Sequence, residues 1–488
     1  MSKPNFVLII TDQQRFDTIG ALGNDKILTP HLDWLTQQGV AFTSTYSDCP
    51  ICAPARQTIM TGQHASTHGM LGNQGVNPDG CPTLPGLLTA DGYQTRAIGK
   101  MHFHPARAHY GYEHIKTTQD YHRYMDRHFP NQRPLDHGIG GNEMYPAFDT
   151  VPVTKTHTHW VVDQSIDFLE TRDQTRPFFL NASFFDPHPP FTPHKDFWDI
   201  YEGIEMPEPV YGDWSQSVED IPQGYMRSTY NLNNVNRFSP QLLAAARRAY
   251  YASITQIDYK LGLLFGRMRE LGLLENTWII FTADHGEMLG DHHMGAKQIF
   301  LEGSAHVPLL VRPPADVAKQ YCGLRGSQCT ELANLADIMP TCLSLSNVEP
   351  PADAKFDGLN LLDMAEGKTS RPHLIGVSPC GCHMVHDGRY KYNFVSAGGD
   401  ELLFDLENDP MEQKNLVDDP KEKENLGRLR QILYVHLEQQ GHPAARDGKL
   451  ISLEDPKSEA EVRAYEANPA CETFNEQLNI NSVPLSST

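Results

Sequence analysis

The sequence predicts an α/β fold: a large mixed, mainly parallel sheet sandwiched by helices, with a smaller C-terminal antiparallel-sheet subdomain. Three observations predict it. Short apolar runs rich in β-branched and aromatic residues, such as 6–10 and 278–282, are typical of strands buried on both faces. Segments with helical spacing, such as 160–171, lie between these runs, as expected when helices cover a sheet. After about residue 370, short alternating segments such as 390–394 indicate a small antiparallel sheet.

The first helix has clear start signals. Thr29 is a helix-capping residue and Pro30 suits the first turn, so the segment 29–35 is expected to be an amphipathic helix. The other elements follow from the same two periodicities. Strands are expected at 6–10, 40–42, 95–98, 178–184, 278–282 and 307–311, and helices at 29–35, 84–90, 160–171 and 239–274.

The domain division follows from the change of pattern near residue 370. We expect a catalytic domain over 1–370 and a C-terminal subdomain over 371–488. Residues 191–237 lack periodicity and predict a long loop over one edge of the fold, and such loops are often lids. The subdomain is expected to hold a small antiparallel sheet with segments such as 390–394 and 401–406, then a helix at 421–440 and a polar tail from about 446.

Composition limits the classes of partner. The 488 residues carry 40 Lys and Arg against 61 Asp and Glu, a net charge of −21, which argues against a nucleic-acid binder. No apolar run reaches the ~20 residues that a membrane span needs. The first apolar run is also too short for a signal peptide and no cleavage site follows it, so we expect a cytoplasmic protein.

The nine cysteines are scattered and contain no paired zinc-binding pattern. Cys49 and Cys52 form one Cys-Pro-Ile-Cys motif, which taken alone could be redox-active or metal-binding. We interpret Cys49 as a structural residue.

Polar side chains recur where the expected strands end. In open α/β sheets, ligands gather at the carboxyl ends of the strands, so these side chains predict a metal-assisted site. The residues concerned are Asp12, Gln13, Lys100, His102, His188, Asp284 and His285.

The residue types in this set suit a divalent cation. Asp12, Gln13 and Asp284 offer the hard oxygen ligands that Ca²⁺, Mg²⁺ or Mn²⁺ prefer, and His285 would add a nitrogen, which leans toward Mn²⁺. Three simpler interpretations stay open at this point. Asp12 could cap a helix, His285 could hydrogen-bond to a ligand without binding the metal itself, and Gln13 could lie outside the ligand set.

Residues 52–62 read Cys-Ala-Pro-Ala-Arg-Gln-Thr-Ile-Met-Thr-Gly. They resemble the type I sulfatase signature C-x-P-[SA]-R-x-x-x-[LM]-T-G. Further blocks similar to that family follow in family order between residues 5 and 416, at 99–102, 183–189, 282–292, 297, 306–309, 403–410 and 415–416. Together they resemble the sulfatase branch of the alkaline phosphatase superfamily, which implies an alkaline phosphatase-like fold and hydrolysis of a sulfate monoester.

The resemblance implies a modified nucleophile. Cys52 would be converted by a maturation enzyme to formylglycine, whose hydrate attacks sulfur and then expels sulfate as the aldehyde re-forms. Arg56 would orient the hydrate. One divalent metal is implied, with Ca²⁺ favoured and Mn²⁺ or Mg²⁺ possible, and its implied ligands are Asp12, Gln13, Cys52, Asp284 and His285.

The resemblance also implies roles for the remaining cations. Lys100 and Lys297 would bind sulfate oxygens and the bridging oxygen, where charge develops in the transition state. His188 is a candidate acid for the leaving alcohol, and His102 a candidate base for the elimination. His104 and Arg107 could bind a substrate carboxylate, or they could belong to a solvated surface loop.

Two departures from the usual family pattern bear on the substrate. Asp12-Gln13 stands where many sulfatases have two Asp residues, and Asp284-His285 where many have Asp-Asn. The combination resembles choline sulfatases and phosphonate monoester hydrolases, and Asp-His with a His before the 307–311 strand also resembles iduronate-2-sulfatase.

We therefore expect a small sulfated substrate. A sulfated oligosaccharide is favoured, with exo-acting removal of a 2-O-sulfate from a uronic acid of glycosaminoglycan fragments. The alternatives are a choline sulfatase, a phosphonate monoester or phosphodiester hydrolase, and a non-catalytic binding protein on the same scaffold.

Overall fold

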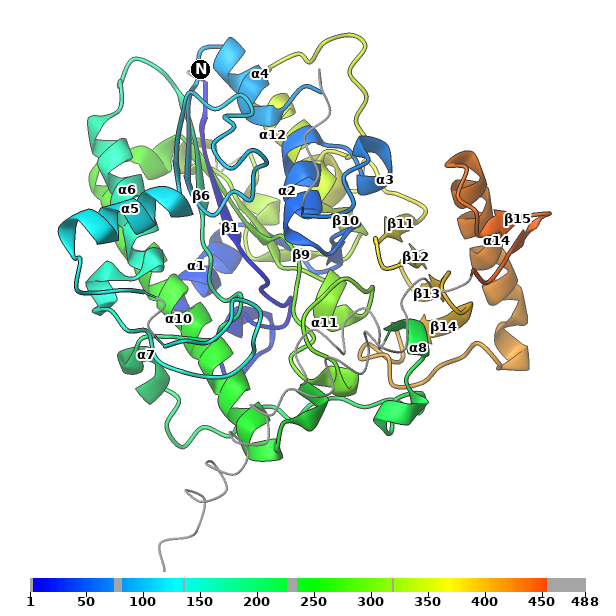
Figure 1. Cartoon of the computed structure of the whole chain (residues 1–488). Coiled ribbons are helices and arrows are strands. Elements are labelled where there is room, and N and C mark those ends of the chain that lie inside the picture. Colours follow the sequence, from blue (N-terminus) through cyan, green and yellow to red (C-terminus); the bar gives the residue numbers. More distant parts are fainter. Residues whose placement is uncertain (1–2, 74–80, 135–136, 226–234, 318–319, 454–488) are drawn as a thin grey trace, which may run out of the picture.

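The computed structural model describes residues 3–73, 81–134, 137–225, 235–317 and 320–453 (Figure 1). Its main sheet has eight strands in the order β5-β4-β6-β1-β7-β8-β2-β9. Pairing is parallel except at β8, which runs antiparallel to β7 and β2. The strands are β1 Asn5–Thr11, β2 Val40–Phe42, β4 Gln94–Gly99, β5 His114–Thr117, β6 Phe178–Ser183, β7 Thr277–Ala283, β8 Leu309–Arg312 and β9 Ser327–Cys329.

The central strands are apolar because both faces of the sheet are covered. Along β1, Phe6 and Leu8 pack into the core on one face, while Val7 and Ile9 pack into the core on the other. The helices that bring apolar side chains to the first face include α2 Cys52–Thr61, α4 Leu84–Ala90, α12 Ile338–Ser346 and α13 Leu361–Ala365. The helices that do so on the second face include α1 Pro30–Gln38, α5 Thr118–His128, α6 His157–Thr171 and α10 Pro240–Glu270. The predicted sandwich is confirmed.

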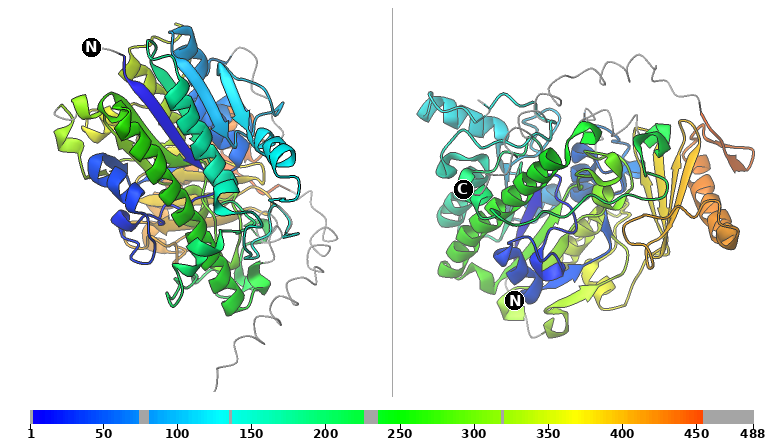
Figure 2. Two further views of the ribbon diagram at one scale, coloured as in Figure 1. Left: turned by 90° about the vertical axis from the view of Figure 1, so that its left-hand side faces the viewer. Right: turned by 90° about the horizontal axis from the view of Figure 1, so that it is seen from below.

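The long helix α10 begins and ends where its sequence allows. The Ser239 hydroxyl accepts a hydrogen bond from the backbone N–H of Leu242, and Pro240 opens the first turn. The helix ends at Glu270, four residues before the predicted end at 274, and a short 3₁₀ turn follows at Leu273–Glu275. Figure 2 shows α10 and α6 side by side across the sheet.

A four-stranded antiparallel sheet follows the main sheet, in the order β11-β12-β13-β14 (Figure 1). One face packs against α14 Lys423–Gln439, and the other packs against earlier parts of the chain through residues such as Tyr46, Trp214 and Phe300. The strands are β11 Leu374–Val377, β12 Cys382–His386, β13 Tyr390–Val395 and β14 Asp400–Asp405. Of the expected polar tail, β15 Ala445–Arg446 and β16 Lys449–Leu450 form a hairpin, and 454–488 lie outside the described residues.

The segment predicted as a long loop at 191–237 is better ordered than a simple loop. It contains α7 Lys195–Asp199 and α8 Gln223–Tyr225. Phe197 and Tyr201 pack in one core with α10, and Trp214 packs near Phe404 of the small sheet. Its described part therefore connects the two sheets, while 226–234 lie outside the described residues.

Other helices and strands of the described residues are β3 Thr45–Tyr46, β10 Ala333–Asn334, α3 Ala65–His68, α5 Thr118–His128, α11 Glu302–Ala305 and α13 Leu361–Ala365.

None of the helices in the described residues is long and apolar enough to span a membrane.

Candidate active site

The carboxyl ends of the central strands bring the predicted polar residues together. Asp12 follows β1 directly, Asp284 follows β7, and Lys100 follows β4. Cys52 is the first residue of α2, all of whose ten residues are buried. Gly99 allows β4 to end close to β6: its φ is 101°, and a Cβ on it would lie 1.8 Å from the carbonyl oxygen of Ser183.

Four buried side chains form a group that suits a metal ion. Donor atoms of Asp12, Cys52, Asp284 and His285 all lie within 4.8 Å of one another. The Cys52 Sγ is 3.2 Å from His285 Nε2 and 3.7 Å from an Asp12 carboxylate oxygen. His285 uses Nδ1 to donate to the carbonyl oxygen of Gly286, which leaves the Nε2 lone pair directed into the group. Two carboxylates and an imidazole fit a divalent cation.

Gln13 lies beside this group in a left-handed backbone conformation, with φ of 69°. Its backbone N–H donates to Asp284 Oδ1 at 3.0 Å. Its side-chain oxygen accepts a hydrogen bond from Lys297 Nζ at 2.5 Å, and its side-chain nitrogen donates to Glu287. Gln13 thus contacts the carboxylates of Asp284 and Glu287 and the ammonium of Lys297.

The guanidinium of Arg56 contacts both carboxylates of this group, Asp12 and Asp284. Nε donates to Asp284 at 2.8 Å and Nη2 to Asp12 at 3.1 Å. Nη1 donates to the Ser183 hydroxyl at 2.6 Å and to the Lys100 carbonyl oxygen at 2.5 Å. A planar group with several donors is required for contacts in these directions.

Two lysines and two histidines surround the Cys52 thiol. Lys100 Nζ lies 2.6 Å from an Asp12 carboxylate oxygen, and Lys297 Nζ lies 3.1 Å from His188 Nε2. His188 donates from Nδ1 to the Pro189 carbonyl oxygen at 2.7 Å. His102, with φ of 56°, hydrogen-bonds to the thiol.

The charges around Cys52 shift its titration strongly. Burial raises the pKa of the thiol, but Lys100, Lys297 and His285 outweigh burial and hold the pKa well below its usual value. Burial together with the two lysines lowers the pKa of His188 to about 4, so its ring is neutral at neutral pH.

The pKa values of the two carboxylates, Asp12 and Asp284, are shifted in opposite directions. Burial and the neighbouring Asp12 raise the pKa of Asp284 to about 6. Burial also raises the pKa of Asp12, but Lys100, His188 and Arg56 outweigh it and hold that pKa low. The site therefore concentrates negative charge on Asp12, between the cations.

A cavity of about 340 Å³ opens beside Lys100, and we call it the Lys100 pocket. His104 lies on its wall, so the structure brings this predicted residue to the site. Arg107 is outside the wall and half-exposed, and its guanidinium pairs with Asp120 at 2.7 Å. The pocket is lined by Asn73, Lys100, Met101, His102, Phe103, His104, Ala106, Thr117, Thr118, Gln119 and Phe185.

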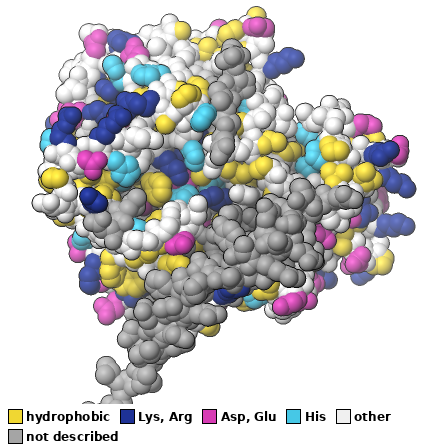
Figure 3. All heavy atoms as spheres, viewed as in Figure 1, with side chains coloured by type: hydrophobic (Ala, Val, Ile, Leu, Met, Phe, Trp, Pro, Cys, Tyr) yellow, Lys and Arg dark blue, Asp and Glu magenta, His cyan; other side chains and the backbone are white. Residues whose placement is uncertain are grey.

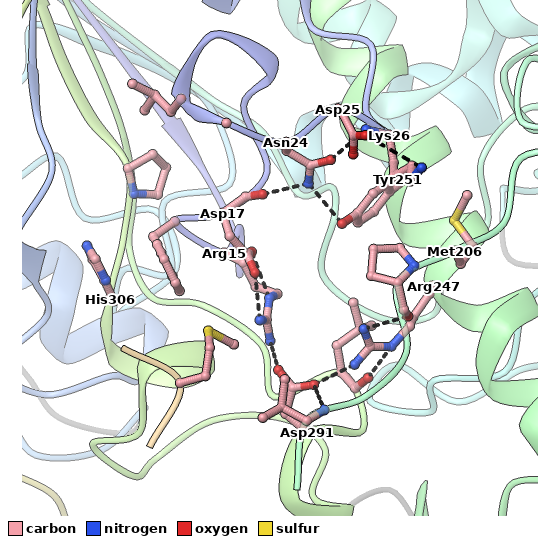
Figure 4. A pocket seen from close by; sticks show the side chains of 18 of the residues that line it. Arg15, Asp17, Asn24, Asp25, Lys26, Met206, Arg247, Tyr251, Asp291 and His306 are labelled. Carbon is pink, nitrogen blue, oxygen red and sulfur yellow. Dashed lines mark hydrogen bonds and ion pairs between the residues drawn. The ribbon is translucent and has the colours of Figure 1, made fainter. Parts of the chain in front are cut away.

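A larger cavity, of about 800 Å³, lies beyond the loop that follows β1 (Figure 4). Neither Cys52 nor Lys100 lines it. The two arginines that line it are paired with Asp291, Arg15 at 2.8 Å and Arg247 at 2.6 Å. This cavity is therefore separate from the group around Cys52.

Three residues of the site had no predicted role. Asn73 accepts a hydrogen bond from the N–H of Ala53 at the start of α2, and Ser183 bridges Arg56 and the Lys100 carbonyl oxygen. Glu287 binds the side chain of Gln13. The sequence holds a signal for the last two, since Ser183 and Glu287 both fall in blocks that resemble the family.

Comparison with known proteins decides the family. The family model described as sulfatase matches residues 4–348, well over half of the chain. The chain belongs to the sulfatase family. A second model, described as the C-terminal part of N-sulphoglucosamine sulphohydrolase, matches residues 290–439 of this sulfatase. As a sulfatase, the protein is an enzyme that hydrolyses sulfuric esters, which confirms the predicted reaction class.

Relatives of the sulfatase span nearly its whole length. The arylsulfatase of Clostridium perfringens is 34% identical over 478 residues, covering 92% of this chain and 97% of that protein. The choline-sulfatase of Rhizobium meliloti is 29% identical over 470 residues, covering 91% of this chain and 88% of that protein.

Solved structures confirm the alkaline phosphatase-like fold. The phosphonate monoester hydrolase of Agrobacterium radiobacter superposes with a TM-score of 0.75 at 24% identity, covering 93% of this chain and all of that one. A protein described as a 2-O GAG sulfatase superposes with a TM-score of 0.71 at 20% identity, covering 96% of each chain.

Proposed function

We propose that this sulfatase hydrolyses a sulfate monoester of a carbohydrate. The observation that carries the proposal is the Lys100 pocket, which adjoins the site through Lys100 and His102. Uncharged hydrogen-bonding side chains line it, among them Asn73, Thr118 and Gln119, together with the ring of Phe185. Amide and hydroxyl groups suit the hydroxyls of a sugar, and a phenyl ring suits its apolar face.

The finer proposal is an exo-acting enzyme for a 2-O-sulfated uronic acid at the end of a glycosaminoglycan oligosaccharide. His104, on the pocket wall, is the proposed contact for the uronate carboxylate. Arg107 would have to exchange Asp120 for that carboxylate. The description of one structural neighbour as a 2-O GAG sulfatase supports this substrate class. In Figure 3, Lys and Arg side chains gather on the upper left of the face shown, which would favour an anionic fragment despite the net charge of −21.

The roles we propose follow from the contacts. Arg56 holds both metal-site carboxylates and so fixes the position of residue 52 relative to them. Lys100 and Lys297 bind the sulfate group, and their charge stabilises the oxygens as negative charge builds up. His188 directs Nε2 toward Lys297, so Nε2 can take a proton from the ammonium and pass it to the leaving oxygen. His102, beside residue 52, accepts the proton when sulfate leaves.

Two groups absent from the chain as encoded complete the proposal. Formylglycine at position 52, made by a maturation enzyme, would supply a hydroxyl nucleophile. A divalent cation held by Asp12, Asp284, His285 and residue 52, with Gln13 beside them, would polarise the sulfate oxygens, and we favour Ca²⁺.

The proposed boundary between catalytic domain (1–370) and C-terminal subdomain (371–488) falls just before β11.

The decisive experiment compares substrates. We would measure kcat/KM for an aryl sulfate, choline sulfate, an aryl phosphonate monoester and 2-O-sulfated disaccharides. The proposal requires a disaccharide to exceed the others by about 100-fold or more, because pocket amides left unpaired by other leaving groups cost free energy. A phosphonate preference of that size would refute it. Turnover of none of them would favour a binding protein.

Choline sulfate is the weaker alternative on structural grounds. A quaternary ammonium needs aromatic faces or carboxylates around it. The described residues that line the Lys100 pocket include no carboxylate, and they include the ammonium of Lys100, which repels a second cation.

Mass spectrometry tests the nucleophile. Conversion of the Cys52 thiol to the aldehyde lowers the mass of the peptide that contains it by about 18 Da. A fully active enzyme whose Cys52 peptide keeps the thiol mass would refute the formylglycine nucleophile.

Removal of divalent cations tests the metal. Dialysis against a chelator should abolish turnover, because it removes the cation that Asp12 and Asp284 would hold and that would align the sulfate. Adding Ca²⁺ back should restore more turnover than adding Mg²⁺ or Mn²⁺. Metal binding should also raise the thermal midpoint by linkage. Full turnover after exhaustive chelation would contradict the metal site.

A further inference from the structure

The proposed ligands of the cation lie in two loops, one after β1 and one after β7. Asp12 and Gln13 belong to the first loop, and Asp284 and His285 belong to the second. The two segments are joined just before these residues, because β1 pairs with β7 and the backbone N–H of Asp284 donates to the Thr11 carbonyl oxygen at 3.3 Å. A cation binds several ligands at once, so its affinity depends on the spacing of the two loops.

Arg15 joins the same two loops again, further along both segments. It belongs to the loop after β1, and its Nη1 donates to the carbonyl oxygens of Glu287 at 2.9 Å and Met288 at 3.2 Å, both in the loop after β7. Nη1 also lies 2.8 Å from a carboxylate oxygen of Asp291, a contact drawn in Figure 4. One side chain therefore spans the two loops that carry the proposed ligands.

The guanidinium of Arg15 is held in one orientation by its surroundings. Arg15 is only 3% exposed, and Nε and Nη2 donate to the two carboxylate oxygens of Asp17 at 2.9 and 2.8 Å. A Cβ on Gly303 of α11 would lie 2.7 Å from Nη1, so the group is packed closely against the backbone of that helix. The guanidinium therefore acts as a fixed link between the loops.

Tyr250 of α10 supports the first loop from the other side. Its hydroxyl donates to the Gln13 carbonyl oxygen at 2.6 Å and accepts from the backbone N–H of Arg15 at 2.9 Å. Tyr250 is fully buried and its ring packs against Phe191, so the hydroxyl is positioned by the core. The contacts of Arg15 and Tyr250 involve backbone groups and side chains outside the proposed ligand set, so they are compatible with a bound cation.

We propose that Arg15, supported by Tyr250, is a positioning residue of this sulfatase: it fixes the spacing between the loop with Asp12 and the loop with Asp284, and so sets the affinity and the size preference for the cation. The inference rests on the proposed function, in which these two loops hold a divalent cation. Arg15 lies outside the proposed ligand set and acts through the backbone of the loops.

Arg15→Lys separates the charge of this residue from its spacing role. A lysine keeps a positive charge beside Asp17 and Asp291, but its single nitrogen cannot serve both carboxylates and the two carbonyl oxygens of the other loop. The loops should then move more freely relative to each other. Loops that move freely can close around the smaller Mg²⁺, whereas loops held at the spacing of Ca²⁺ discriminate against it.

The experiment titrates the chelator-treated full-length chain with Ca²⁺ and with Mg²⁺ by calorimetry, with the state of residue 52 matched by mass spectrometry. In Arg15→Lys we expect the Kd for Ca²⁺ to rise by about tenfold or more, the scale on which groups behind metal ligands act. We also expect the ratio of the Kd for Mg²⁺ to the Kd for Ca²⁺ to fall by about threefold or more. The inference requires both changes, so a wild-type Kd for Ca²⁺ or a wild-type ratio in folded Arg15→Lys would overturn it.

Arg247→Lys is the matched control. Arg247 pairs with the same Asp291 at 2.6 Å and donates to the Leu289 carbonyl oxygen at 3.0 Å, but it lies on α10 rather than in the loop after β1. It should lower the thermal midpoint about as much as Arg15→Lys while the Kd for Ca²⁺ stays at the wild-type value. An equal loss of Ca²⁺ affinity in both variants would show a general effect of disturbing Asp291 and would overturn the inference.

A second variant decides if Arg15→Lys does not fold. Tyr250→Phe removes only the hydroxyl that supports the first loop, and it should raise the Kd for Ca²⁺ by about threefold or more. A wild-type Kd in this variant would then overturn the inference. A wild-type protein that binds no divalent cation would refute the metal of the proposed function, whereas tight Ca²⁺ binding by the wild type and equally by the variants would overturn only the inference.

Discussion

Arg56 lies at the centre of the candidate active site, and its chemistry cannot be supplied by another cation. Its three nitrogens donate to Asp12, Asp284, Ser183 and the Lys100 carbonyl oxygen, from one rigid plane. A lysine carries the same charge on one nitrogen and reaches fewer of these partners. A substitution by lysine would therefore keep the positive charge at position 56 and remove most of the hydrogen bonds that the guanidinium makes.

Arg56→Lys tests that separation. We expect kcat/KM to fall by about 100-fold or more, because the metal-site carboxylates and the Lys100 backbone lose their common brace. The charge stays in the site, so the thermal midpoint should fall by only a few degrees. Turnover within threefold of wild type would show that charge alone suffices at position 56.

At the scale of elements, the sequence alone could predict the buried strands and their ends. The runs 6–10 and 278–282 became β1 and β7, because an apolar run without alternation fits a strand covered on both faces. The 307–311 run became β8, but its antiparallel direction depends on which neighbours it pairs with, and no local pattern encodes that.

Other elements escaped prediction for physical reasons. The helix α2 is buried on all sides, so it has no polar face and no amphipathic pattern. The strand β12 reads Cys-His-Met-Val-His, and its histidines hide the fact that all five residues are buried. In the site, Asp12 and Asp284 could be placed at strand ends. The link between Gln13 and Glu287 could not, because it joins side chains far apart in sequence.

The junction of β4 and β6 makes an element-scale prediction. Gly99→Ala should abolish turnover and lower the free energy of unfolding by about 2 kcal/mol or more. A left-handed φ of 101° and a Cβ 1.8 Å from the Ser183 carbonyl oxygen both oppose it. Gly92→Ala is the matched control, since Gly92 has φ of 92° and open space around it. Urea unfolding of both variants checks this, and equal losses would show that the close approach to Ser183 does not matter.

At the scale of the whole molecule, a buried ionic cluster joins the two sheets. Lys391 of β13 is fully buried and pairs with Glu302 of α11 and, at 2.8 Å, with Glu412. Glu302 also binds His306, which is stacked between Phe16 and Tyr46. Buried charges of this kind are held only while all partners are present.

Lys391→Met should therefore destabilise the protein by about 3–5 kcal/mol, since it leaves two buried carboxylates without their cation. Lys368→Met removes a lysine from the exposed pair with Glu366 and should cost less than about 1 kcal/mol. Urea unfolding compares the two, and a similar small loss in both would contradict the importance of the cluster.

Buried histidines should make the fold sensitive to acid. Burial lowers the pKa of His157 and His383 to about 3, and that of His68, His292 and His386 to about 4. The unfolded chain binds these protons near pH 6.5 while the folded protein does not, so stability falls as pH drops from about 6.5 toward 4.

Thermal midpoints measured between pH 7.5 and 4.5 in chelator check this expectation. His383→Met should reduce the slope, because both ring nitrogens of His383 lack a hydrogen-bond partner among the described residues and the ring resists protonation only through burial. A midpoint that stays constant over this range would contradict it.

The burial of α2 has a consequence in time. Cys52 is 1% exposed in the folded chain, so the proposed maturation enzyme would have to reach its thiol before folding closes the site. The ribosome adds Lys297 roughly 250 residues after Cys52, which at about 5–20 residues per second leaves an interval on the order of 10–50 s. Molecules that miss this interval would fold with a thiol sealed inside. The active fraction of a preparation would then record the supply of the maturation enzyme during synthesis, and later treatment of the folded protein could not raise it.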